Sequence, residues 1–96
     1  MAKGKALSER LETTDAGFSQ ADLASILLHH GYEFAGNARH GVVYKHPELV
    51  VHPDETVRRR FARVMIPAGN ELPKYAARAV RHSVQALLEY KEGENG

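Results

Sequence analysis

The chain has 96 residues, of which 43% are hydrophobic and 26% charged, a composition typical of one small globular domain. It contains no cysteine, which excludes disulfides and thiolate metal sites and agrees with a reducing cytosol. No apolar run approaches the roughly 20 residues that cross a bilayer. The basic N-terminus lacks the apolar segment of a signal peptide. We therefore expect a cytoplasmic protein without a membrane segment.

The net charge of +1 hides an uneven distribution. Between residues 56 and 82 the only acidic residue is Glu71, whereas acidic residues gather in residues 9–22 and near the C-terminus. A basic face of this kind is typical of proteins that bind polyanions, although an ordinary solvated surface is the alternative. The basic residues of this stretch are Arg58, Arg59, Arg60, Arg63, Lys74, Arg78 and Arg81.

The first half of the chain contains one well-marked helix. Residues 1–17 have little periodicity and are expected to form a flexible N-terminal extension. Ser19 is a good N-cap and Asp22 its capping-box partner. Apolar residues then recur at helical spacing, and Gly31 ends the pattern. These signals predict a helix over about residues 20–30.

Three segments have the β-branched and aromatic composition of strands. They are residues 32–35, 42–44 and 61–66. Gly36-Asn37 is the predicted turn between the first two, and residues 49–51 either extend this hairpin or form an extra strand. Residues 58–60 are expected in a loop before the third strand.

The second predicted helix begins near Pro73, where a missing N–H is tolerated, and ends near Tyr90. Residues 92–96 are expected to be a disordered tail. The order predicts an α+β domain over residues 18–91, of αβββα topology, with both helices on one face of a three-stranded antiparallel sheet. The predicted core consists of Leu23, Ile26, Leu27, Phe34, Val64, Val80 and Val84.

Four segments, in this order and spacing, resemble the HicA (YcfA-like) toxin family. They are Leu27-Leu28-His29-His30-Gly31-Tyr32-Glu33, Tyr44-Lys45-His46-Pro47, Arg63-Val64-Met65-Ile66-Pro67, and Glu71-Leu72 followed by a helix. The resemblance implies a fold like that of double-stranded-RNA-binding domains (dsRBD-like). It also implies a bacterial or phage mRNA interferase, a metal-independent endoribonuclease without a cofactor, and a HicB-like antitoxin as partner.

The resemblance also points to a catalytic histidine at the start of the second strand. In the family this histidine stands three residues before the strand's aromatic residue, but here His40 stands four residues before Tyr44. A β-bulge at Gly41 would absorb the extra residue and turn His40 back. RNA cleavage without a metal needs a base and an acid. His40 is the expected base, and His46 is either a second participant or a structural residue that hydrogen-bonds the following loop.

Two groups of basic residues are expected to contact RNA. Arginines in a loop at 58–60 would follow a phosphate backbone, and Lys74, Arg78 and Arg81 share one helical face. The full predicted set is Arg39, Lys45, Arg58, Arg59, Arg60, Lys74, Arg78 and Arg81. The same residues would suit an acidic antitoxin.

The six histidines lack a chelating spacing, so no metal site is expected. Three functions stay open at this stage. The chain is an endoribonuclease, a non-catalytic RNA-binding or regulatory protein, or a protein-interaction module whose oligomeric state the sequence does not fix.

Overall fold

The computed structural model describes residues 2–95. Within them, three strands form one antiparallel sheet in the order β1–β2–β3, accompanied by four helices. The fold class is therefore α+β, as predicted. In chain order the elements are α1 (Ala2–Leu11), α2 (Gln20–His29), β1 (Glu33–Ala38), β2 (Gly41–Lys45), α3 (Glu55–Phe61), β3 (Arg63–Pro67) and α4 (Lys74–Asn95). No helix among the described residues is long and apolar enough to cross a membrane.

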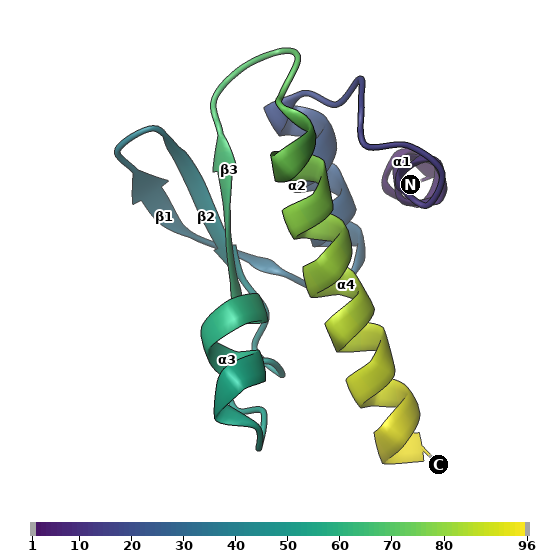
Figure 1. The fold of residues 1–96 in the computed structure, drawn as a ribbon, viewed down its shortest axis with the longest axis vertical. Helices are drawn as coiled ribbons and strands as arrows, with labels where there is room; N and C mark the ends of the chain where they lie inside the picture. Colours follow the sequence, from purple (N-terminus) through teal and green to yellow (C-terminus); the bar gives the residue numbers. More distant parts are fainter. Residues whose placement is uncertain (1, 96) are drawn as a thin grey trace.

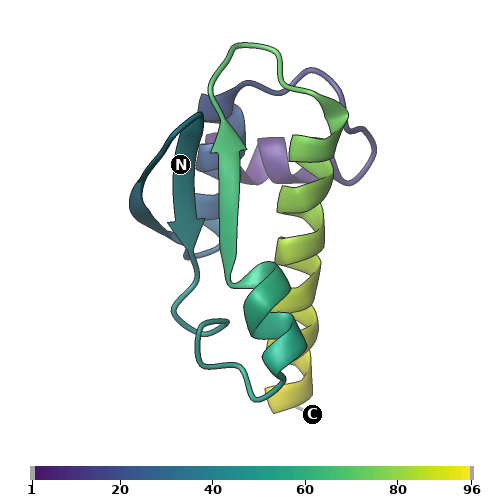
Figure 2. The same ribbon diagram turned by 60° about the vertical axis from the view of Figure 1, so that its left-hand side comes forward.

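The sheet has one covered face and one open face. α2 and α4 lie on the covered face, and α1 lies on the side of α2 away from the sheet (Figure 1). Tyr44, Val64 and Ile66 are buried toward these helices. Met65 alternates with them along β3 and is 47% exposed on the open face. Figure 2 shows α3 between the start of β3 and the C-terminal half of α4.

Local signals placed α2 correctly. The Ser19 hydroxyl accepts a hydrogen bond from the Asp22 N–H at 3.1 Å, and the Asp22 carboxylate accepts one from the Ser19 N–H at 3.1 Å. The predicted capping box is therefore confirmed. Gly31 follows the helix with a φ of +88°, a conformation that favours glycine.

The predicted core is confirmed at six positions and wrong at one. The six confirmed residues are Leu23, Ile26, Leu27, Val64, Val80 and Val84, all buried. Phe34 is 55% exposed because β1 is an edge strand that the helices do not fully cover. Its ring keeps only an edge contact with the ring of Tyr44, at 5.8 Å between centroids.

Both ends of the chain are more ordered than the sequence predicts. Residues 2–11 form α1 in place of a flexible extension, with Leu7 and Leu11 buried in the core. At the other end α4 continues to Asn95, where a disordered tail was expected, and Gly96 lies outside the described residues. Packing against α2 supplies the stability that a ten-residue helix lacks alone.

Three predicted boundaries in the middle of the chain are wrong. The hairpin turn is Arg39-His40, and the predicted turn at Gly36-Asn37 lies within a longer β1. Residues 49–51 lie in turns. Residues 58–60 belong to α3, not to a loop, because the Asp54 carboxylate caps that helix by accepting the Thr56 N–H at 2.8 Å.

Candidate nucleic-acid interface

A basic hollow of about 250 Å³ lies where α3, β3 and α4 meet. Arg60 and Arg63 stand on its rim, together with His82 of α4. No acidic residue among the described ones lines it. The full lining is Arg60, Phe61, Arg63, Val64, Met65, Ala79 and His82. Two guanidinium groups around an apolar floor suit a ligand with both anionic and flat apolar parts.

The corner between α3 and β3 brings the two arginines together. Arg60 is in the last turn of α3, and Arg63 opens β3 after the buried Ala62. Ser83 of α4 fixes this corner, since its hydroxyl donates to the Phe61 carbonyl at 2.7 Å. The Tyr32 hydroxyl lies 2.6 Å from the same Ser83 oxygen, and burial raises the pKa of Tyr32 to about 12. Ser83 is therefore hydrogen-bonded both to Tyr32 and to the end of α3.

Both guanidinium groups are available to a ligand. Arg60 and Arg63 are exposed, and neither side chain forms a hydrogen bond or ion pair with a described residue. Arg60 lies over the Phe61 ring, 5.9 Å from its centroid. In the sheet, Lys45 of β2 lies opposite Arg63 of β3 and extends the basic surface of the open face. Glu33 of β1 lies opposite Lys45 on its other side.

The predicted helical group of RNA contacts has another role. Asp15 accepts a hydrogen bond from Arg78 Nε at 2.9 Å and another from Arg81 Nη1. These bonds, from Arg81 first and then Arg78, lower the pKa of Asp15. The two arginines thus fasten the loop after α1 to α4. Lys74 lines a separate polar hollow together with them. Arg78 and Arg81 therefore face Asp15, and neither lines the hollow that Arg60 borders.

The remaining predicted RNA contacts are spread over the surface. Arg59 is exposed on α3, where it adds to the basic surface near the hollow. Arg58 instead donates from Nη1 to the His52 carbonyl, which holds the start of α3. Arg39 is exposed in the hairpin turn, between the end of β1 and the start of β2.

The predicted β-bulge at Gly41 is wrong. Gly41 pairs regularly with Ala38 and Pro67, and the irregularity in the ladder falls between Phe34 and Gly36. A Cβ on Gly41 would lie 2.0 Å from the Ile66 carbonyl oxygen, so this position needs glycine for close approach of β3.

His40 stands apart from the basic hollow. It is exposed in the two-residue turn, and its carbonyl accepts the Ala68 N–H at 3.0 Å. Arg63 pairs with Lys45, four residues along β2 from Gly41, which corresponds to roughly 13 Å at about 3.3 Å per residue. His40 therefore does not line the hollow that Arg60 and Arg63 border.

His46 is a structural residue. It is 2% exposed, and its Nδ1 accepts the Glu48 N–H at 3.1 Å. Its Nε2 must then carry the proton, which it donates to the His30 carbonyl at 3.0 Å. Burial, as the largest cause, lowers the pKa of His46 and keeps the ring neutral. The expectation that His46 hydrogen-bonds the following loop is confirmed, and neither ring nitrogen is left for a substrate.

Comparison with known proteins adds no relative. No protein-family model, curated protein or solved structure matches the chain. The likeness to HicA therefore rests on its four motifs alone. Within residues 2–95 no three histidine or acidic side chains are grouped so that they could hold a metal ion.

Proposed function

We propose that the protein binds RNA without cleaving it, with Arg60 and Arg63 on the phosphates beside the hollow at β3. In this proposal α2, β1, β2, β3 and α4 form a HicA-like, dsRBD-like core, to which α1 and α3 are additions. The observation that carries it is the pair of exposed, unpaired guanidinium groups around a hollow without acidic lining. Lys45 and Arg59 would extend the contact along the backbone.

This surface suits the repeated phosphates of a nucleic acid better than it suits a single small anion. Each phosphate neutralised by an arginine releases counterions, so several separated basic groups add up to useful affinity. The apolar floor of Phe61, Met65 and Ala79 gives an unstacked base a surface to lie on. An acidic antitoxin of the HicB type would compete for the same arginines, since its carboxylates would pair with them in the same way.

Binding without catalysis is favoured by the positions of the two histidines. Cleavage through the ribose 2′-hydroxyl needs a base and an acid at one phosphate, with cations around it. His40 does not line the hollow, and its neighbour Gly41 lies roughly 13 Å from the Arg63 end of β2 at about 3.3 Å per residue. His46 is buried with both nitrogens occupied. A toxin-type endoribonuclease that uses His40 is the alternative function.

The test is the salt dependence of binding to a fluorescently labelled single-stranded RNA of about 20 nucleotides. Arg60→Ala and Arg63→Ala should each reduce the slope of log affinity against log salt by about 0.7, one phosphate contact each. Arg78→Ala is the matched control, because Arg78 is hydrogen-bonded to Asp15 and does not line the hollow at β3, so its slope should equal that of the wild type. Equal losses in all three variants would assign the binding to general charge.

The same RNA, analysed on a denaturing gel, tests the absence of cleavage. The wild type and His40→Ala should both leave it intact over hours. Cutting by the wild type that is lost in His40→Ala would establish the ribonuclease and reject a purely binding role.

A further inference from the structure

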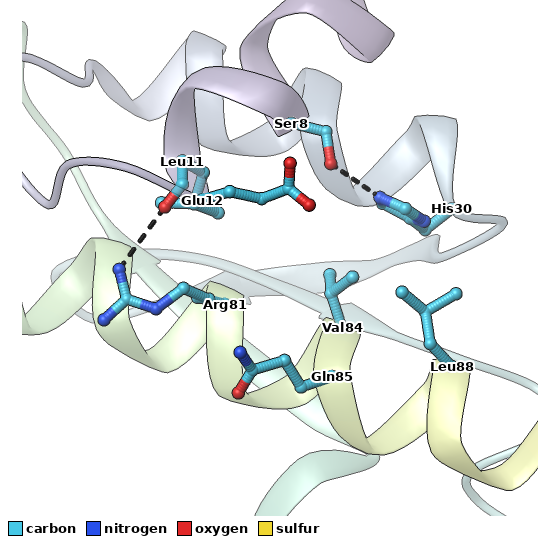
Figure 3. A pocket seen from close by; sticks show the side chains of 8 residues that line it. All are labelled: Ser8, Leu11, Glu12, His30, Arg81, Val84, Gln85 and Leu88. Atoms are coloured by element: carbon cyan, nitrogen blue, oxygen red, sulfur yellow. Dashed lines mark hydrogen bonds between the residues drawn. The ribbon is translucent and has the colours of Figure 1, made fainter.

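A second, larger hollow lies on the side of α4 that faces α1. It occupies about 370 Å³ between α1 and α4, and the end of α2 closes one side of it (Figure 3). Pockets for small molecules typically measure about 300–1,000 Å³. This hollow exists because α1 packs on α2 through Leu7 and Leu11 and leaves a space toward α4. It shares no lining residue with the hollow at β3.

Its inner wall is apolar. Leu11 of α1 and Val84 of α4 are buried at its base. Leu88 stands at the wall with 48% of its surface exposed. A ligand with an apolar body would cover this leucine and gain hydrophobic free energy in proportion to the area removed from water.

The polar groups at the two ends of the hollow already have partners. At one end Arg81 Nη1 donates to the Leu11 carbonyl at 3.3 Å and to Asp15, a carboxylate that it shares with Arg78. At the other end Ser8 Oγ and His30 Nε2 are hydrogen-bonded at 2.8 Å. Burial, as the largest cause, lowers the pKa of His30. The His30 ring is therefore neutral near pH 7 and does not repel a cation.

Glu12 is the exception. Its carboxylate points into the space between α1 and α4, as Figure 3 shows. It forms no hydrogen bond or ion pair with any described residue. Gln85 lines the hollow from α4 and likewise has no hydrogen-bond partner for its side-chain amide among residues 2–95. Glu12 is thus the charged group of this lining that has no partner among the described residues, and it stands beside an apolar wall.

We propose that this hollow binds a small primary amine with an apolar body, the ammonium group on Glu12 and the apolar part on Val84 and Leu88. A purely apolar ligand would strip water from the carboxylate without replacing its hydrogen bonds. An anionic ligand would be repelled by it. An ammonium group gives Glu12 a charge-assisted hydrogen bond, and Gln85 offers a further acceptor. The volume equals that of about a dozen water molecules at about 30 Å³ each, which suits an amine of arylalkyl size.

The test is a titration of the ¹⁵N-labelled full chain with 2-phenylethylamine, followed by two-dimensional NMR. Saturable shifts should gather on Leu11, Val84, Gln85 and Leu88. 3-Phenylpropanoate, which carries the same ring on an anion, should produce no saturable shifts there. Glu12→Gln should weaken amine binding about tenfold or more, the usual effect of losing a hydrogen bond to a charged group.

Glu9→Gln is the matched control, because Glu9 is an exposed carboxylate on α1 that does not line the hollow. It should bind the amine as the wild type does. Both substitutions replace exposed side chains and should leave the spectrum of the fold unchanged. Equal binding of amine and carboxylate, absence of saturable shifts up to about 10 mM amine, or equal weakening in both variants would overturn the proposal.

Discussion

Gly41→Ala should destabilise the protein, although replacing glycine by alanine usually stabilises a strand. A Cβ at this position would lie 2.0 Å from the Ile66 carbonyl oxygen and 2.9 Å from the Pro67 Cα. Ordinary van der Waals contact begins at 3.4 Å, so β3 would have to retreat by about 1.4 Å. The nearby hydrogen bond from the Ala68 N–H to the His40 carbonyl, now 3.0 Å long, would not survive such a shift.

The expected size of the effect follows from these contacts. One or two lost backbone hydrogen bonds cost about 1 kcal/mol each, and forcing atoms into a packed site costs about 1–3 kcal/mol. We therefore expect the free energy of unfolding to fall by about 2–4 kcal/mol. That is a large part of the roughly 5–15 kcal/mol typical of native domains. Urea unfolding followed by far-ultraviolet circular dichroism measures it, with the slope against urea expected to stay constant.

Gly93→Ala is the control, because Gly93 has a negative φ in α4 and a Cβ added there would meet no neighbouring atom. It should be neutral or stabilise the protein by up to about 1 kcal/mol. If Gly41→Ala were as stable as the wild type, β3 would not pass close to Gly41. The bulge that the sequence suggested would then be restored as an explanation for the extra residue before Tyr44.

Two further outcomes test the core and the buried histidines. Leu27→Ala should lower the free energy of unfolding by about 2–5 kcal/mol, since Leu27 is fully buried, and a loss below about 0.5 kcal/mol would contradict its place in the core. Burial lowers the pKa of His46, so the unfolded state takes up a proton first as pH falls below the ordinary value of 6.5. The wild type should therefore lose stability between about pH 7 and pH 5. His46→Asn should lose less over that range, because it does not titrate, and an equal loss in both proteins would contradict the assignment.

Interactions between near neighbours in the chain were predictable from the sequence. Ser19 and Asp22 lie three residues apart, so their capping box could be recognised without the fold. His46 binds the N–H of Glu48, two residues on, and this bond was also foreseen. Such contacts depend on the local backbone, which residue types and spacing largely determine. The fold class followed from the same local patterns.

Interactions between distant segments were decided by the tertiary structure. Asp15 meets Arg78 across 63 residues, which turned expected RNA contacts into a fastening for the loop after α1. The hollow that Arg60 and Arg63 border is completed by Ala79 and His82 of α4, and Ser83 of the same helix holds the end of α3. The spacing of residues within one segment does not show which distant residue will pack against that segment.

Gly41 shows the same difference between what the sequence predicts and what the tertiary structure decides. The sequence revealed that Gly41 displaces His40 by one residue from the position expected by family likeness, and a bulge was a reasonable way to absorb it. Whether the strand bulges depends on β3, which begins 22 residues later and passes too close to Gly41 for any side chain. Close packing between strands decides this position, because two backbones cannot share the space that a Cβ would occupy.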